Sequence, residues 1–193
     1  MSEAGTHIGV ARARAGAVSG RPARAVVAAP AVHELAVRAA LAEVMDPELP
    51  MLSVVDLGIV HRVEVNPEGP IRVEILPTFV GCPALELIKS SIADRLAAFG
   101  RPVEVIATFE VPWTSERITE AGRAALLTAG IAPPGADSAG IVQGGLIDLG
   151  QRVPCPHCGS RRTMLENLFG PTQCRTIRYC ADCRQPFEAI KPV

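Results

Sequence analysis

Four of the six cysteines form two C-x2-C pairs: Cys155 and Cys158 in CPHC, and Cys180 and Cys183 in CADC. Each pair presents two thiolates from one tight turn, and two such turns complete a tetrahedral site of four sulfur ligands. Zinc is the expected metal, although four thiolates also suit a single iron ion or an iron–sulfur cluster. Disulfides are a weaker alternative, because nothing in the sequence indicates an oxidising compartment.

The segment that carries these pairs is too short to bury a large core. We therefore expect metal binding to contribute much of its stability. Three runs between and after the pairs are typical of short strands: TMLENLF, RTIRY and PFEAI. The pattern predicts a four-cysteine zinc ribbon, a small β module, over residues 151–193.

Two further residues of this segment could take part in chemistry. Cys174, in LFGPTQCR, exceeds the four-ligand count and is either a reactive thiol or an alternate ligand. His157 lies inside the first cysteine pair, and we interpret it as a surface residue.

Cys82 lies far from the ribbon, in TFVGCPAL, between a strand-like and a helix-like run. We predict that it caps the helix, with Pro83 in the first turn, where the missing proline N–H has no helical partner. Gly81 favours a tight turn that leaves the sulfur uncovered. A thiolate there faces unpaired N–H groups and the helix dipole, so we predict a lowered pKa. The alternative is a small buried residue at a strand–helix junction.

The segments around Cys82 predict an α+β domain. In some segments apolar residues recur at helical spacing, which predicts helices. In HRVEV and IRVEI they alternate with charged residues, which predicts strands. The turn sequence NPEGP makes these two runs antiparallel strands, and DPELP ends the helix before them. We expect helices over 31–45, 85–99 and 118–130, and strands over 61–65, 71–75 and 103–107.

Charge is divided unevenly along the chain. Residues 46–149 carry seven basic and fourteen acidic side chains, whereas residues 150–193 carry seven basic and three acidic ones. This asymmetry favours two modules with different electrostatic roles. The Arg- and Ala-rich start is interrupted by prolines, and we interpret it as a disordered extension without a targeting role. The predicted divisions are an extension at 1–30, the α+β domain at 31–133, a Gly/Pro-rich linker at 134–150 and the ribbon at 151–193.

Two long signatures in the α+β domain resemble those of the MIP18-like (DUF59) family, whose members are linked to iron–sulfur cluster assembly. They are DPELPMLSVVDLGIV at 46–60 and PTFVGCPA at 77–84. The resemblance implies a small α/β sandwich with a three-stranded sheet and flanking helices. It also implies one surface site that handles a transient iron or iron–sulfur cluster, lined by Asp46, Asp56, Thr78 and Cys82. From the residues alone, turn and capping roles explain the two aspartates better.

The order of the two modules resembles the D subunits of the phenylacetyl-CoA epoxidase system. The segments VPWTSERITEAGRAALLTAGIAPP at 111–134, CPHCGS, LFGPTQCR and CRQPFEAIK carry this resemblance, with Arg117 standing where the family has tryptophan. The resemblance implies an accessory role in aerobic phenylacetate degradation: maturing or maintaining an iron or iron–sulfur centre of the oxygenase, with no catalysis of its own. It implies the other epoxidase subunits as partners, and a homodimer remains open.

Other functions remain open or are disfavoured by the sequence. The chain could instead be an integral, non-catalytic docking subunit of the oxygenase. Nucleic-acid binding is disfavoured by the acidic middle, the net charge of −1 and the scarcity of aromatic residues in the ribbon. We found no nucleophile elbow, phosphate loop, dinucleotide fingerprint or paired Glu-x-x-His motif. No apolar run approaches the ~18 residues that span a bilayer, so we expect a soluble protein. Its expected location is the cytoplasm.

Overall fold

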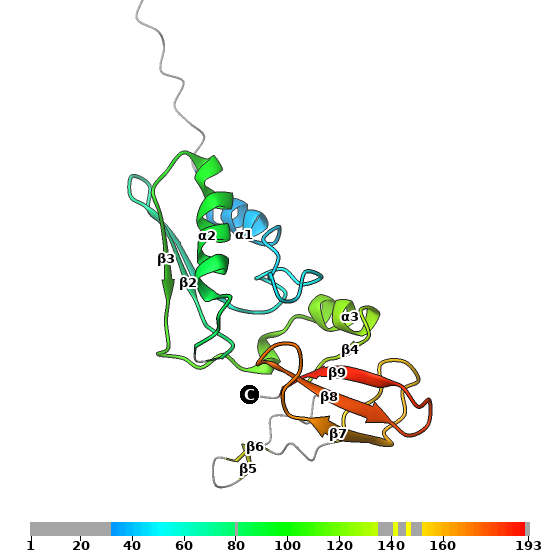
Figure 1. Cartoon of the computed structure of the whole chain (residues 1–193). Helices are drawn as coiled ribbons and strands as arrows, with labels where there is room; N and C mark the ends of the chain where they lie inside the picture. The colour runs from blue at the N-terminus through cyan, green and yellow to red at the C-terminus, as the bar shows by residue number, and fades with distance from the viewer. Residues whose placement is uncertain (1–31, 80, 135–140, 143–145, 148–151, 192–193) are drawn as a thin grey trace, which may run out of the picture. The chain divides into compact units, whose positions relative to one another are not determined.

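The structure of the chain, a computed structural model, describes residues 32–79, 81–134, 141–142, 146–147 and 152–191 (Figure 1). Residues Ala31–Val193 form one compact unit. The predicted extension at 1–30 lies outside the described residues. Within the described part, no helix is both long enough and apolar enough to cross a membrane.

A three-stranded sheet forms the centre of the α+β domain, as predicted. Its strands are β1 (Val60–Val65), β2 (Ile71–Ile75) and β3 (Val103–Ala107), in the order β1-β2-β3. The strands β1 and β2 are antiparallel, with Val63 opposite Val73. Strand β3 runs parallel to β2, so the chain must cross over between them. Helix α2 (Leu85–Leu96) makes this crossover (Figure 1).

Alternation along the strands sends one set of side chains into the core. Val63, Val73 and Ile75 are buried, whereas Glu64 and Glu74, which point to the other face, are partly exposed. Ile88, Ile92 and Leu96 from α2 complete the same core, which is the helical face that the spacing predicted. A short 3-10 helix, η1 (Ala97–Phe99), follows α2 and ends at Gly100, which takes the left-handed conformation (φ 67°).

The first helix, α1 (Glu34–Leu41), is shorter than the predicted 31–45. Beyond it, the backbone pairs with a later segment instead of continuing the helix. The N–H of Asp46 donates to the carbonyl of Leu52 (2.8 Å), and the N–H of Val54 donates to that of Val44 (2.8 Å). This pairing folds DPELP into an irregular loop, which fixes the position of Asp46.

The third helix, α3 (Glu120–Thr128), agrees with its prediction. Thr119 caps it by accepting a hydrogen bond from the N–H of Gly122 (3.0 Å). A short 3-10 helix, η2 (Ser115–Arg117), comes before it. Strand β4 (Ile131–Ala132) follows α3 directly and begins the second sheet.

The ribbon is a four-stranded sheet in the order β4-β9-β8-β7. Strands β7 (Thr163–Asn167), β8 (Arg175–Cys180) and β9 (Pro186–Ile190) lie where the sequence predicts them. β4 pairs in parallel with β9, with Ile131 opposite Glu188. Ile190, at the end of β9, is buried in the core of the α+β domain. The end of the α+β domain is therefore bonded directly into the ribbon sheet.

The predicted linker at 134–150 is described only in part. Strands β5 (Ile141–Val142) and β6 (Leu146–Ile147) pair antiparallel within it. The rest, at 135–140, 143–145 and 148–150, lies outside the described residues. The proposed domain boundaries stay a prediction, but residues on either side of this segment contact each other through β4, β9 and Ile190.

Candidate metal centre and thiol pocket

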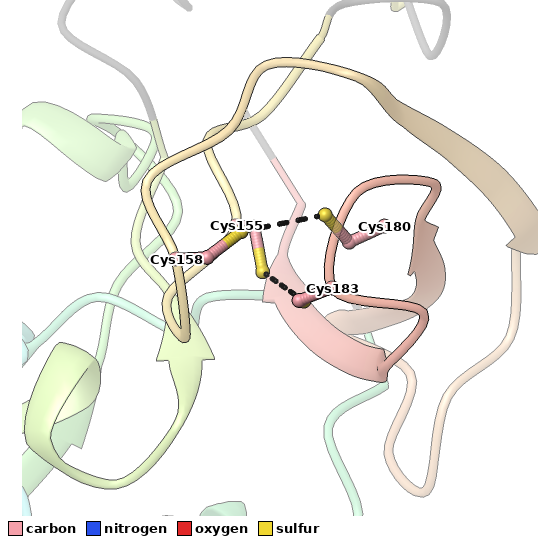
Figure 2. A group of neighbouring side chains, drawn as sticks. All are labelled: Cys155, Cys158, Cys180 and Cys183. Atoms are coloured by element: carbon pink, nitrogen blue, oxygen red, sulfur yellow. Dashed lines mark hydrogen bonds between the residues drawn. The ribbon is translucent and has the colours of Figure 1, made fainter.

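The four ribbon cysteines converge on one point (Figure 2). Cys155 and Cys158 come from the turn before β7, and Cys180 and Cys183 from the end of β8 and the turn into β9. Their four sulfur atoms all lie within 4.8 Å of one another. The Sγ atoms of Cys155 and Cys183 are 3.6 Å apart, as are those of Cys158 and Cys180.

These sulfur distances fit a tetrahedral metal site. With metal–sulfur bonds of about 2.3 Å, the sulfurs of a tetrahedron lie about 3.8 Å apart. The N–H of Cys183 lowers the pKa of Cys180 to about 6, whereas burial raises the pKa of Cys183 to about 12. A cation bound by all four sulfurs would stabilise their thiolate forms together. His157 is exposed, as the sequence suggested.

A second candidate site is a mostly apolar cavity of about 70 Å³. One water molecule needs roughly 10–15 Å³ by the same kind of measure, so the cavity can hold a ligand of several atoms. Apolar side chains form most of its wall: Ile75, Leu85, Ile88 and Ile190 come from β2, α2 and β9, and the others come from the loops between elements. The side chains with reactive or charged groups along the wall are Asp46, Glu48, Thr78, Cys82, Cys174 and Lys191.

Cys82 does not cap helix α2, which corrects the sequence-based prediction. The helix begins at Leu85, and Ala84 is the N-cap. Tight i to i+3 bonds before the helix explain the difference: the N–H of Cys82 donates to the carbonyl of Phe79, and the N–H of Leu85 donates to that of Cys82, both at 3.2 Å. Gly81 has a positive φ of 82° and open space around it, so the predicted turn is present.

The pKa of Cys82 is raised, not lowered as the sequence suggested. Burial of the half-buried thiol is the largest cause. The N–H of Ala84 bonds to the sulfur and opposes the shift, but the nearby charges of Glu48, Asp46 and Cys174 raise the pKa further. Cys82 is therefore a protonated thiol at neutral pH until a cation or a base draws off its proton.

Asp46 is buried beside the thiol and holds its own loop together. Its Oδ1 accepts hydrogen bonds from the N–H groups of Glu48 and Leu49, both at 2.8 Å. Burial nevertheless raises the pKa of the carboxyl, because the low-dielectric surroundings disfavour its charge. This geometry is the turn role that the sequence suggested for an aspartate, and it also places the carboxyl on the wall of the cavity.

Asp56 does not line the cavity. Its carboxylate accepts hydrogen bonds from Ser53 Oγ (2.6 Å) and Thr119 Oγ1 (2.9 Å). The N–H of Thr119 also donates to the carbonyl of Asp56 (2.9 Å). These contacts tie the loop before β1 to the start of α3. A role for Asp56 in the thiol site stays a prediction.

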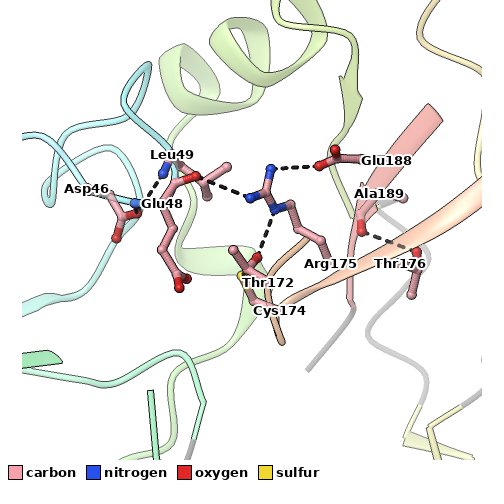
Figure 3. Close-up of polar contacts among 9 residues, drawn as sticks. All are labelled: Asp46, Glu48, Leu49, Thr172, Cys174, Arg175, Thr176, Glu188 and Ala189. Atoms are coloured by element: carbon pink, nitrogen blue, oxygen red, sulfur yellow. Dashed lines mark hydrogen bonds and ion pairs between the residues drawn. The ribbon is translucent and has the colours of Figure 1, made fainter. Parts of the chain in front are cut away.

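Cys174 reaches the cavity from the loop before β8 (Figure 3). Thr172 Oγ1 lies 3.1 Å from the sulfur of Cys174. The carbonyl of Cys174 accepts a hydrogen bond from the N–H of Lys191 (2.9 Å). Burial raises the pKa of this thiol as well. The sequence left Cys174 as either a reactive thiol or an alternate ligand, because its place on the cavity depends on how the ribbon packs.

Arg175, next to Cys174, connects the ribbon to the loop of Asp46 (Figure 3). Its guanidinium donates to the carbonyl of Glu48 (3.4 Å) and to Thr172 Oγ1 (2.8 Å), and pairs with Glu188 (2.6 Å). Trp113 also lines the cavity, with its indole N–H bonded to the carbonyl of Leu57 (3.0 Å). Neither role could be inferred from a local pattern, since both depend on contacts between distant segments.

Comparison with known proteins defines the class of this chain. Residues 34–106 match the iron–sulfur cluster assembly protein family, and residues 143–191 match the PaaD zinc beta ribbon domain. The chain thus joins an assembly-type domain to a four-cysteine ribbon. It is 36% identical over 168 residues to the Escherichia coli (strain K12) protein assigned as the D subunit of 1,2-phenylacetyl-CoA epoxidase, covering 86% of this chain and 96% of that protein. The chain belongs to this family of epoxidase D subunits.

Two relatives match the first domain alone and are covered over most of their own length. The Fe-S protein maturation auxiliary factor YitW of Bacillus subtilis (strain 168) is 30% identical over 89 residues, covering 45% of this chain and 86% of the factor. The Fe-S protein maturation auxiliary factor SufT of Staphylococcus aureus (strain USA300) is 33% identical over 85 residues, covering 43% and 96%. A crystal structure of a DUF59 domain from Bacillus anthracis is 29% identical, covers 48% and 90%, and has a TM-score of 0.46.

Proposed function

We propose that this protein is an accessory factor that matures or maintains an iron or iron–sulfur centre of the phenylacetyl-CoA epoxidase system, with Cys82 as the thiol that handles the metal. The observation that carries the proposal is the cavity at which Asp46 meets Thr78 and Cys82, which belong to a different segment. The names of its relatives support the same role, since two are Fe-S protein maturation auxiliary factors and one is an epoxidase D subunit.

The two cysteine sites suit different tasks. The ribbon supplies four sulfurs and leaves no open coordination position, which is typical of a structural site. We assign zinc to it, held by Cys155, Cys158, Cys180 and Cys183. The pocket thiol instead leaves most positions on a metal open, so a cargo could be accepted there and passed on.

The partners follow from the same proposal. The other epoxidase subunits are the recipients, and the protein acts in the cytoplasm, where free thiols stay reduced. All six cysteines are free in the structure, which suits such a compartment.

The test is replacement of the wild-type gene by Cys82→Ser, with growth on phenylacetate as the readout. Serine is close in size to cysteine, but it has no soft sulfur ligand, and its alkoxide does not form near neutral pH. We expect growth to be lost while the fold and the ribbon metal persist, as checked by circular dichroism and elemental analysis. Ser90→Ala, at an exposed position of α2, is the control and should grow normally.

The outcome also separates the proposal from its main alternative. Normal growth with Cys82→Ser would exclude metal handling by this thiol and favour a docking role in the oxygenase. A docking role requires lasting co-purification with the oxygenase, whereas an accessory factor requires only transient contact.

A further inference from the structure

We propose that Cys174 supplies a second thiolate to the pocket of Cys82, so that the iron cargo is held between one sulfur of the α+β domain and one of the ribbon. This inference rests on the proposed function and deepens it by naming the second ligand. It also gives the ribbon a direct part in the site, beyond its own metal.

The first support is position. Cys82 and Cys174 are 92 residues apart in the sequence, numbers 82 and 174, yet both line the same cavity. The two thiols are close enough that the charge of Cys174 acts on Cys82, and Asp46 and Glu48 act on both. Two thiols and two carboxyl groups, all of which become anions when they lose a proton, therefore lie around the same cavity.

The second support is that Cys174 is held in place. The N–H of Lys191 donates to its carbonyl (2.9 Å), and Thr172 lies 3.1 Å from its sulfur. Arg175, the next residue, is fixed by Glu188, Thr172 and the carbonyl of Glu48. A ligand whose backbone is fixed on both sides costs little further ordering when it binds a metal.

The third support is the charge around the pocket. The nearby cations have partners of their own: Lys191 Nζ donates to the carbonyl of Gln173 (2.5 Å) and lies over the ring of Phe169, and Arg175 pairs with Glu188. The charge of Arg175 also lowers the pKa values of Cys174 and Asp46, but burial outweighs it and both are raised. A bound cation would thus meet two thiolates and nearby carboxylates inside a largely apolar wall. Sulfur ligands in such surroundings select thiophilic metals such as iron over magnesium or calcium.

Binding requires no redox step. Two S–H bonds break and two Fe–S bonds form, two protons leave to solvent, and the iron keeps its oxidation state. Among the described residues, only the ribbon cluster brings three or more ligand atoms into chelating distance. The pocket therefore offers an incomplete set, and the remaining positions on the iron stay open to the donor or the recipient.

Two measurements test this inference on the full-length protein with its ribbon metal in place. In the first, the protein is reduced, the reductant is removed anaerobically, and dibromobimane, which bridges neighbouring thiols, is then added and removed before digestion. We expect a cross-linked peptide pair containing Cys82 and Cys174, absent from Cys82→Ser and from Cys174→Ser. Separate single adducts on the two thiols, with no bridge, would overturn the inference.

In the second, ferrous iron alone is titrated anaerobically, with quenching of Trp113 as the signal. Trp113 is the single tryptophan and lines the cavity. We expect one iron per chain beyond the ribbon metal, at least tenfold weaker in Cys174→Ser and in Cys82→Ser. Gln173→Ser, at an exposed neighbour, is the matched control and should bind as the wild type does.

The pattern of loss distinguishes the two proposals. If Cys82→Ser loses iron and growth on phenylacetate while Cys174→Ser retains both, the second-ligand inference is wrong and the proposed function stands. If the wild type binds no second metal, and Cys82→Ser still supports growth, both are wrong.

Discussion

At the scale of single residues, burial and one hydrogen bond act on the pKa of the Cys82 thiol in opposite directions. A cysteine followed by proline before a helix predicts a cap and a lowered pKa. The structure retains one feature of that picture, the N–H of Ala84 bonded to the sulfur, but burial outweighs it. A half-buried thiol with a raised pKa reacts slowly with oxidants and alkylating agents. This suits a site that should react only with a delivered metal.

This environment predicts slow alkylation of Cys82. A raised pKa means a smaller thiolate fraction at neutral pH, and the thiolate is the reactive form. In a Cys174→Ser background with the ribbon metal bound, iodoacetamide should modify Cys82 more slowly at pH 7 than it modifies an unstructured cysteine peptide. The rate should rise with pH to a midpoint above that of the peptide. A midpoint below the peptide's would restore the helix-cap interpretation.

Asp56 carries a second prediction at this scale. Its carboxylate accepts hydrogen bonds from Ser53 and Thr119 and joins two segments. Asp56→Ala leaves these partners unsatisfied, so we expect the free energy of unfolding to fall by about 1–3 kcal/mol. Urea denaturation measures this, with exposed Asp94→Ala as the control, expected within about 0.5 kcal/mol of wild type. Loss of iron binding by stable Asp56→Ala would show a direct role in the site instead.

At the scale of elements, the DLG signature has a structural explanation. Gly58 has a φ of 71°, and a side chain there would place its Cβ 2.2 Å from the carbonyl oxygen of Arg117. Arg117 in turn donates from Nε to the carbonyl of Gly58 (2.9 Å). Arg117, which stands where the epoxidase D-subunit family has tryptophan, thus packs against Gly58 of the DLG signature. The signature therefore marks a position where two backbone segments approach closely.

Gly58→Ala should therefore lower the free energy of unfolding by more than the positive φ alone would. Gly100 is the matched control, since its φ is 67° but nothing lies within 4 Å of the added Cβ. We expect Gly100→Ala to cost about 1–2 kcal/mol in unfolding free energy, and Gly58→Ala clearly more. Equal losses in urea denaturation would mean that the contact with Arg117 relaxes freely.

The elements also show what the sequence can and cannot predict. The strands β1, β2, β3, β7, β8 and β9 were predictable because alternation and cysteine spacing are local signals. The helix α1 was predicted too long, because backbone pairing between Val44 and Val54 overrides helical spacing. The two-residue strand β4 gives no periodic signal at all. Its pairing with β9 places Cys174 near Cys82, so the composite pocket could not be derived from the sequence.

At the scale of the whole molecule, strand pairing, core packing and a hydrogen bond join the ribbon to the α+β domain. Separate modules on a flexible linker would lose stability independently. Here β4 pairs with β9, Ile190 is buried in the core of the α+β domain, and Arg175 bonds to the carbonyl of Glu48. Cys174, Ile190 and Lys191 form part of the wall around Cys82. We therefore expect the stabilities of the two modules to be coupled.

Removal of the ribbon metal should open the pocket of Cys82. The ribbon cannot hold its strands without the metal, so β9 and the loop of Cys174 should loosen. After chelation, we expect Cys82 to be alkylated at least several-fold faster and the emission of Trp113 to shift to longer wavelength.

Ile190→Ala should reproduce part of this effect with the metal bound, and should lower the free energy of unfolding by about 2–5 kcal/mol. Met164→Ala, at an exposed position of β7, should not. If the metal leaves while Cys82 and Trp113 remain unchanged, the ribbon does not support the pocket, and the two sites act separately after all.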